Sequence, residues 1–297
     1  MNNSIMKKYI HNWDDLNNEQ KEAAKKEFKG NAALNAEVVH PAAKFFEENS
    51  WVKIDGFLDL NMCNLLYHHT QLEASRLNFL QEQGIQHDAG HYGTFSDTQA
   101  PGDFSKYGDP VMDALVSLSL AKIQELTALD LVPTYSYHRL YTTDTELKRH
   151  IDRHSCEIST TVCLGYDVSN VDPNTYPDWD WPMFIKEKNG KEVPVHMKPG
   201  DMMIYRGCDL EHWREPFWGK NHAQLFMHYN EKIEGERSNI FDNRPILGFD
   251  SKFKDGTVPL DRPKEHNKVE SDEGKDAKDY RTEIKEYTPK TSKKIIY

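Results

Sequence analysis

The chain has 297 residues, of which 37% are hydrophobic, so it can bury one substantial core. A formal net charge of −11 at pH 7 argues against nucleic acid or an anionic membrane as the main partner, because phosphate-binding surfaces need clustered Lys and Arg. No apolar run approaches the length of a membrane span, and residues 1–30 lack the apolar centre of a secretory signal, which predicts a cytoplasmic protein.

The predicted domain organisation is one folded unit with two extensions. All-β domains of this length are often undivided. We expect a polar N-terminal extension at 1–40, a single domain at 41–230 and a charged C-terminal extension at 231–297. From about residue 261 the mixed charge and scarcity of apolar residues are typical of a solvated tail. Nothing in the sequence indicates the oligomeric state.

The four cysteines show no metal-binding or redox spacing. Cys63, Cys156, Cys163 and Cys208 include no C-x-x-C pair. They are typical of buried thiols in a reducing compartment, so we expect neither a zinc cluster nor a disulfide framework.

Helical patterns are confined to the first half of the predicted domain. Residues 61–80 are helix-like. Residues 86–107 have little periodicity and indicate a long loop, which is a candidate cover for a site. A second helix is predicted over 109–126, with Asp109 as N-cap and Pro110 in the first turn.

The second half is a series of short strands. Asn189-Gly190 predicts a hairpin with a tight primed turn, because this dipeptide tolerates positive φ angles. Many short strands with turn punctuation and no helical pattern between them indicate a mainly β (α+β) fold with a sandwich or jelly-roll core, supported by the N-terminal helices. The predicted strands are 135–141, 147–152, 156–164, 181–187, 192–197, 202–205, 210–214 and 223–229.

A candidate metal site lies on two of these strands. His150 and Asp152 share one face of their strand by alternation, and His212 lies on a later strand. Two imidazoles and one carboxylate on a rigid sheet would bind a divalent metal on one face and leave the opposite positions open. This ligand set is typical of non-haem Fe(II) oxygenases.

The ordered set of elements resembles a known family. His-x-Asp, the Asn-Gly hairpin, the Lys198-Pro-Gly-Asp201 turn, the distal His212 and a final strand are similar to the 2-oxoglutarate/Fe(II)-dependent dioxygenases, most closely their prolyl-4-hydroxylase-like branch, over 41–230. The resemblance implies a double-stranded β-helix that binds Fe(II) through His150, Asp152 and His212. It implies an enzyme that uses 2-oxoglutarate and O2, with ascorbate as an optional addition. The retained Asp152 favours hydroxylation over halogenation.

The resemblance also implies a cation for the far carboxylate of 2-oxoglutarate, and here the sequence departs from the family. Position 222, where the family has Arg or Lys, is a histidine. The candidates are Arg214, Lys220 and His222. We rank Arg214 first, because it shares a face with His212 and its planar guanidinium can bind a carboxylate at two points. Tyr141 resembles the tyrosine that the family directs at the cosubstrate, and an ordinary strand aromatic is an equal alternative.

Substrate contacts are less determined. Arg139 alternates with Tyr137 and Tyr141 and should face the interior, where an unpaired guanidinium is costly. It could bind an acidic substrate group, bind 2-oxoglutarate or pair with Glu157. Arg153, beside the metal ligands, is a candidate for the mouth of the site.

The predicted reaction is therefore hydroxylation of an unactivated C–H bond coupled to decarboxylation of 2-oxoglutarate. A small molecule or peptide is the expected partner, and prolyl or other amino-acid substrates are compatible. A cupin-type metal-binding protein, or a metal-dependent isomerase or hydrolase without 2-oxoglutarate, is the alternative. Such a protein would need no cation for the far end of an oxo acid.

Overall fold

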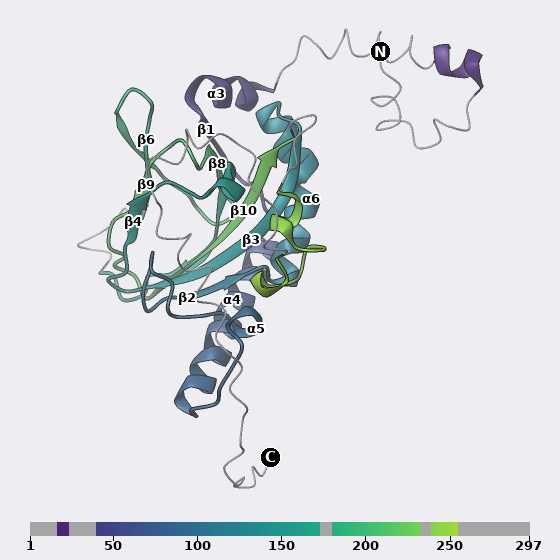
Figure 1. Ribbon diagram of the computed structural model, residues 1–297. Helices are drawn as coiled ribbons and strands as arrows, with labels where there is room; N and C mark the ends of the chain where they lie inside the picture. Colours follow the sequence, from purple (N-terminus) through teal and green to yellow (C-terminus); the bar gives the residue numbers. More distant parts are fainter. Residues whose placement is uncertain (1–16, 24–39, 173–179, 233–238, 255–297) are drawn as a thin grey trace.

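The computed structural model describes residues 17–23, 40–172, 180–232 and 239–254, and its main feature is a pair of antiparallel sheets (Figure 1). The larger sheet has the strand order β1-β8-β5-β10-β3-β2, and the smaller has β4-β9-β6-β7. The strands are β1 (Trp51–Ile54), β2 (Phe104–Tyr107), β3 (Leu131–Thr142), β4 (Leu147–His150), β5 (Ile158–Asp167), β6 (Met183–Lys186), β7 (Glu192–Val195), β8 (Met202–Arg206), β9 (His212–Arg214) and β10 (Asn221–Glu231).

The order in which the chain visits the two sheets defines the architecture. From β3 onward the chain passes repeatedly between them, with β3, β5, β8 and β10 in the larger sheet and β4, β6, β7 and β9 in the smaller. All pairings are antiparallel. Eight strands wound in this way form a jelly roll. The predicted mainly β fold with a jelly-roll core is confirmed, and within the described residues no strand pairing closes the two sheets into a barrel.

Helices cover the outer face of the larger sheet (Figure 1). Both predicted helices are present, and α6 begins where the sequence indicates. The Asp109 carboxylate accepts hydrogen bonds from the backbone N–H groups of Val111 and Met112, so it satisfies donors that have no partner within the helix. The helices are α3 (Pro41–Asn49), α4 (Leu60–Glu82), α5 (Ala89–Tyr92) and α6 (Pro110–Thr127), and short 3-10 turns are η2 (His154–Cys156), η3 (Ile240–Asn243) and η4 (Ser251–Phe253).

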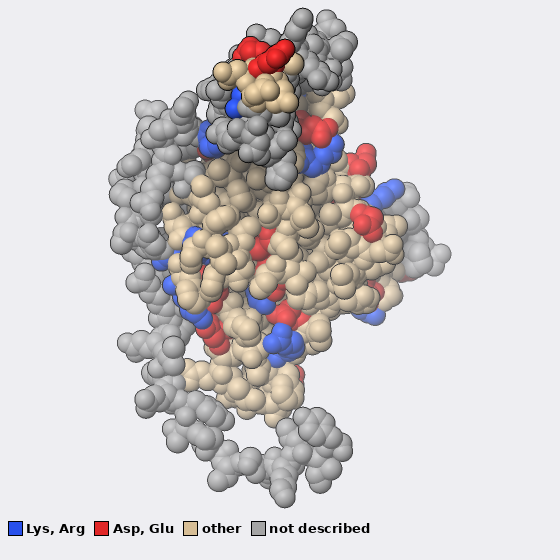
Figure 2. All heavy atoms as spheres, turned by 90° about the vertical axis from the view of Figure 1, so that its right-hand side faces the viewer, with Lys and Arg blue, Asp and Glu red and all other residues tan. Residues whose placement is uncertain are grey.

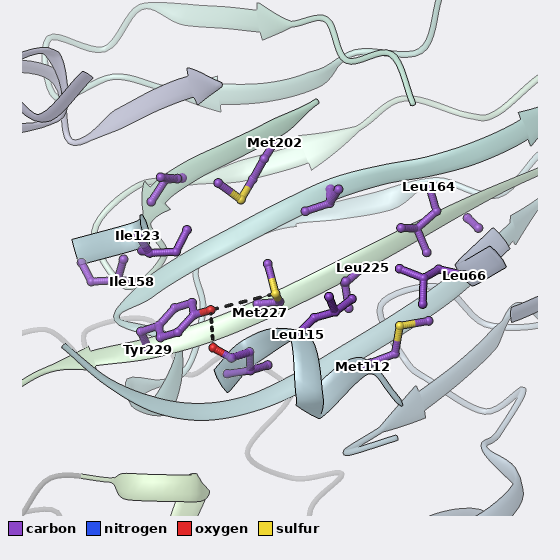
Figure 3. Packing of buried hydrophobic residues seen from close by; sticks show 14 of the residues in the cluster. Leu66, Met112, Leu115, Ile123, Ile158, Leu164, Met202, Leu225, Met227 and Tyr229 are labelled. Carbon is purple, nitrogen blue, oxygen red and sulfur yellow. Dashed lines mark hydrogen bonds between the residues drawn. The ribbon is translucent and has the colours of Figure 1, made fainter. Parts of the chain in front are cut away.

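Alternation along the strands separates the main apolar core from the face between the sheets, which holds buried polar side chains beside a second apolar cluster. On β10, Leu225 and Met227 belong to the core cluster between the larger sheet and the helices, whereas Gln224, His228 and other alternate residues are buried on the opposite face. In the core, the Tyr229 hydroxyl donates to the Val116 carbonyl at 3.0 Å (Figure 3). The face between the two sheets is therefore the place for a site. Core residues labelled in Figure 3 are Leu66, Met112, Leu115, Ile123, Ile158, Leu164, Met202, Leu225, Met227 and Tyr229.

The β6–β7 hairpin differs from its prediction in the turn. The last strand pair is Lys186 with Glu192, so the connection is longer than a two-residue primed turn. The Gly190 N–H donates to the Glu187 carbonyl at 2.8 Å, and of the two predicted turn residues only Gly190 has a positive φ, of 86°. Of the two residues, Gly190 alone therefore adopts the left-handed conformation, which glycine tolerates without steric cost.

The segments outside the strands contribute to the interior. The predicted loop at 86–107 contains α5 and ends in β2. Residues 239–254, from the predicted C-terminal extension, pack beside β3 through η3. Most of the N-terminal extension and residues 255–297 lie outside the described part of the chain. Among the described helices, none is long and apolar enough to cross a membrane.

Candidate active site

The structure brings the three predicted metal ligands together. His150 ends β4 and lies opposite His212, the first residue of β9, in the sheet register. Asp152 follows two residues after β4. Its Oδ1 lies 3.6 Å from His150 Nε2 and 3.4 Å from His212 Nε2. One ligand atom from each residue lies within 4.8 Å of the others, which is the spacing that a shared ion requires.

The two imidazoles are held in the form that binds metal. His150 Nδ1 lies 2.6 Å from the Lys148 carbonyl, and His212 Nδ1 lies 2.9 Å from the Leu210 carbonyl. A carbonyl only accepts, so each Nδ1 carries the proton and donates it. Each Nε2 then faces Asp152, and a bound metal would take the place of any proton there.

Asp152 is fixed by contacts on its other side. Ser159 Oγ donates to Asp152 Oδ2 at 2.6 Å, and the Asp152 N–H donates to the Gly207 carbonyl at 2.8 Å. A Cβ at position 207 would lie 2.6 Å from Ser159 Oγ and closer still to Asp152 Oδ2, so the close approach requires glycine. Burial alone would raise the pKa of Asp152, but His212 and His150 outweigh it and hold the pKa well below its usual range. The carboxylate is therefore ionised.

His228 is a contact of this site that the sequence did not indicate. From the sequence, it reads as a surface or satisfied core histidine. Its Nδ1 lies 3.0 Å from Ser159 Oγ. Because the single hydroxyl proton of Ser159 goes to Asp152, Ser159 accepts from His228 Nδ1–H. Burial lowers the pKa of His228 to about 4, so it is neutral. With Asp152 and Cys156 it forms a second set of possible ligand atoms that shares one residue with the first.

Arg214 occupies the interior two residues after His212. Its side chain is 2% exposed, its Nη1 donates to the Trp181 carbonyl at 2.7 Å, and its guanidinium carbon lies 4.5 Å from the centre of the Trp181 ring. Within the described part of the chain, Nε and Nη2 of Arg214 have no hydrogen-bond partner. A buried guanidinium with two unsatisfied nitrogens is costly and suits an anionic ligand.

The two other candidate cations have different surroundings. His222 is buried, and burial together with the nearby Arg214 lowers its pKa well below the usual range. It is therefore neutral and cannot supply charge. The Lys220 side chain is 53% exposed, and its Nζ lies 3.7 Å from Asp167 Oδ2 at the surface. Of the three candidates, only Arg214 is both buried and charged.

Tyr141 and Arg139, two interior residues of β3, belong to one hydrogen-bond network. Arg139 Nη1 donates to the Tyr141 hydroxyl at 3.1 Å, and its Nε donates to Ser105 Oγ at 3.1 Å. Its ion-pair partner is Asp97 from the 86–107 loop. Pairing of Arg139 with Glu157 is not observed, because Glu157 instead accepts from Asn230 and from the backbone of Glu231. The sequence around Arg139 did not indicate its pairing with Asp97, because Asp97 lies in a loop far from Arg139 along the chain.

A pocket extends outward from the metal ligands. The 86–107 loop forms part of its wall, and the segment 239–254 contributes Lys254. Arg214 is not among the described residues that line the pocket. Other lining residues include Asp97, Tyr107, Tyr135, Tyr137, Arg139, Leu147, Arg153, Tyr205 and Phe226.

The surface charge is mixed. On the face shown in Figure 2, the described Lys and Arg side chains lie among Asp and Glu and do not gather into one patch. This face offers no extended track for a phosphate backbone.

Comparisons with known proteins gave structural similarities only. The sequence matches no protein-family model and no curated protein. A prolyl-4-hydroxylase of Pseudomonas putida aligns with 66% of this chain and 100% of its own, at 15% identity and a TM-score of 0.44. HygX of Streptomyces hygroscopicus, with nickel, 2-oxoglutarate and hygromycin B bound, aligns with 73% of this chain and 100% of its own, at 14% identity and a TM-score of 0.44.

A third similar structure is a prolyl hydroxylase of Trichoplax adhaerens in complex with a hypoxia-inducible factor peptide. It aligns with 68% of this chain and 92% of its own, at 16% identity and a TM-score of 0.41. These similarities are low in both sequence identity and TM-score.

Proposed function

We propose that the protein is a non-haem Fe(II) oxygenase that uses 2-oxoglutarate to hydroxylate a C–H bond. The donor set fits the metal: His150 Nε2, His212 Nε2 and Asp152 Oδ1 are two nitrogens and one carboxylate oxygen on one face of a site, which is the ligand set of this class. The other coordination positions would face the pocket that these residues line.

The observation that carries the choice of cosubstrate is the pair of unsatisfied nitrogens on Arg214. A metal-binding protein, isomerase or hydrolase without an oxo acid has no use for a buried guanidinium two residues beyond a ligand. A dicarboxylate would satisfy it with charge-assisted hydrogen bonds and remove the cost of burying it. Because Arg214 does not line the pocket, neighbouring side chains must move when the dicarboxylate binds.

Each residue has a definite task under this proposal. When bound, Fe(II) and 2-oxoglutarate would supply the oxidative chemistry, which amino-acid side chains lack. His150, Asp152 and His212 hold the metal, and Ser159 and the two backbone carbonyls orient these ligands. Arg214 binds the far carboxylate. Tyr141, which contacts both Arg139 and the Trp181 ring, lies behind the pocket lining with Arg214 and would contact the cosubstrate after the same rearrangement.

The test is direct measurement of cosubstrate binding and turnover. We expect the protein with Mn(II) to bind 2-oxoglutarate by calorimetry, and the protein with Fe(II), O2 and ascorbate to convert it to succinate. Asp152→Ala should abolish both. Asp167→Ala, which removes a carboxylate paired at the surface with Lys220, should change neither.

Failure to bind or decarboxylate 2-oxoglutarate, across a broad panel of candidate substrates, would contradict the proposal and favour the cupin-type alternative. A prolyl substrate and a cytoplasmic location stay predictions from the sequence.

A further inference from the structure

The wall of the pocket nearest the C-terminal segment holds more cations than carboxylates. Arg153 forms a two-point pair with Asp242, with Nη1–Oδ1 at 2.9 Å and Nη2–Oδ2 at 2.7 Å. Lys254 pairs with the same carboxylate at 2.5 Å. Arg153 and Lys254 line the pocket and are 25% and 22% exposed, whereas Asp242 is 2% exposed.

Other charged groups near this wall have partners of their own. Arg244, which also faces Lys254, pairs at 2.9 Å with Asp113, and Arg139 pairs with Asp97. Asp88 and Asp250 both pair with Lys252, and Asp152 faces the two histidines of the proposed metal site. Arg153 and Lys254 share the single carboxylate of Asp242, so this group of three side chains carries an excess of one positive charge. Burial and the nearby Arg153 lower the pKa of Lys254 to about 8, in keeping with a site short of anions.

The backbone around Asp242, the carboxylate that both cations contact, is strained. Phe241, Asp242 and Asn243 have consecutive φ angles of 55°, 55° and 62°. Left-handed conformations of residues other than glycine are unfavourable and persist where surrounding contacts over-determine them, often at ligand-binding sites. Here the Tyr107 hydroxyl also donates to Asp242 Oδ2 at 2.7 Å, so four hydrogen-bonding contacts hold one carboxylate.

Tyrosine rings complete the wall. The Arg153 guanidinium lies 4.6 Å from the centre of the Tyr135 ring, and Lys254 Nζ lies 4.6 Å from that of Tyr107. The two rings stack at 4.6 Å. Both cations are thus fixed on aromatic faces beside the pocket, which lowers the entropy lost when they bind a ligand.

We propose that Arg153 and Lys254 form a subsite for an oxyanion of the substrate, a carboxylate or phosphate group, so that the substrate is an acid. This inference rests on the proposed function, since the subsite opens into the same pocket as the metal ligands. It differs from the cosubstrate anchor, which is assigned to Arg214 on the smaller sheet. An acidic group held here would place the rest of the substrate over the metal.

The experiment compares acids with matched neutral compounds. The probes are N-acetylated amino acids, their primary amides and inorganic phosphate, titrated by calorimetry into the protein with and without Mn(II) and 2-oxoglutarate. We expect the preferred acid to bind at least about tenfold more tightly than its amide, because the neutral amide cannot form the charge-assisted hydrogen bonds of a carboxylate. Binding of phosphate instead of the acids would identify the oxyanion as phosphate and supports the subsite equally.

Variants at Lys254 test the subsite, and a variant at Lys252 in the preceding 3-10 turn is the matched control. Lys254→Gln should remove the preference for the oxyanion, and Lys254→Arg should keep most of it. Lys252→Gln, two residues away, should leave it unchanged, because Lys252 pairs at the surface with Asp88 and Asp250. Circular dichroism and thermal unfolding check that each variant is folded.

The outcomes separate this inference from the proposed function. Equal binding of acids and amides without phosphate binding, or a preference that Lys254→Gln does not reduce, would overturn the subsite even where 2-oxoglutarate binds normally. Absence of 2-oxoglutarate binding would instead overturn the proposed function, whichever way acids and amides compare. Loss of 2-oxoglutarate affinity in Lys254→Gln but not in Arg214→Gln would also overturn the subsite.

Discussion

At the scale of single residues, Arg214 combines an energetic cost with a proposed binding role. The structure satisfies one of its nitrogens through the Trp181 carbonyl and leaves two unsatisfied among the described residues. Arg214→Met should therefore stabilise the metal-free, cosubstrate-free protein by about 1–3 kcal/mol, since an apolar chain of similar length removes a buried unpaired charge. Chemical denaturation of the two proteins measures this difference.

The same variant should bind 2-oxoglutarate at least about tenfold more weakly, because the charge-assisted contacts are lost. Lys220→Met removes an exposed cation and should alter neither stability nor affinity beyond small surface effects. A variant that loses stability and keeps its affinity would show that Arg214 is structural.

Ser159 provides a second residue-scale prediction. Ser159→Ala removes the hydrogen bond to Asp152 Oδ2, so this metal ligand is less well oriented. We expect Fe(II) or Mn(II) affinity to fall about 10–100-fold, the usual effect of removing such a supporting contact. Thr160→Val, on the opposite face of β5, removes a buried hydroxyl that donates to the Met227 carbonyl and should leave metal affinity unchanged. Equal affinities of Ser159→Ala and wild type would refute the role.

At the scale of elements, the turn between β3 and β4 depends on one buried carboxylate. Asp103 Oδ1 accepts from the Thr142 N–H and hydroxyl and from the Thr145 hydroxyl. Burial raises the pKa of Asp103 to about 6, despite these hydrogen bonds. Because the folded state then binds the proton more tightly than the unfolded state, this group destabilises the protein as pH rises from about 4 to about 6.

The corresponding prediction concerns Asp103→Asn. Between about pH 4 and pH 6, the wild type should lose roughly 3 kcal/mol of unfolding free energy relative to this variant. Above about pH 6 the difference should stay constant, because Asp103 is then ionised in both states. Urea denaturation at a series of pH values measures it. A difference that is constant with pH would show that Asp103 ionises normally.

The elements also show what the sequence could and could not predict. Alternation predicted the interior face of β3, because a strand with one buried face constrains each side chain. The predicted strand 147–152 was too long: β4 ends at His150, and Asp152 lies beyond it, so the position of Asp152 beside His150 does not come from strand alternation. The observed strand bounds differ from the predicted ones by several residues. For example, β10 spans Asn221–Glu231, whereas the sequence predicted a strand at 223–229. The partners Asp97 and Asp242 were not predicted, because each reaches the site from a loop whose position depends on tertiary packing and leaves no periodic signal.

At the scale of the whole molecule, a buried ion pair attaches the C-terminal segment to the domain. Arg244 and Asp113 are 0% and 1% exposed and lie 2.9 Å apart, and Arg244 also donates to the Thr134 carbonyl. Arg244→Ala should cost about 3–5 kcal/mol, because it leaves a buried carboxylate without its cation. Lys122→Ala, which breaks an exposed pair with Glu125, should cost less than about 1 kcal/mol. Thermal or urea unfolding distinguishes the two.

The attachment of residues 239–254 to one wall of the pocket places half of the proposed substrate subsite in a separate part of the gene. The proposed metal ligands, the cosubstrate anchor and Arg153 come from the chain between His150 and Arg214, whereas Lys254 and its carboxylate partner Asp242 follow the last strand. Codons for this short segment can therefore be exchanged without altering the strands that carry the chemistry. Selection on such exchanges would let one catalytic scaffold acquire new substrates, and libraries built over these sixteen or so positions would do the same in the laboratory.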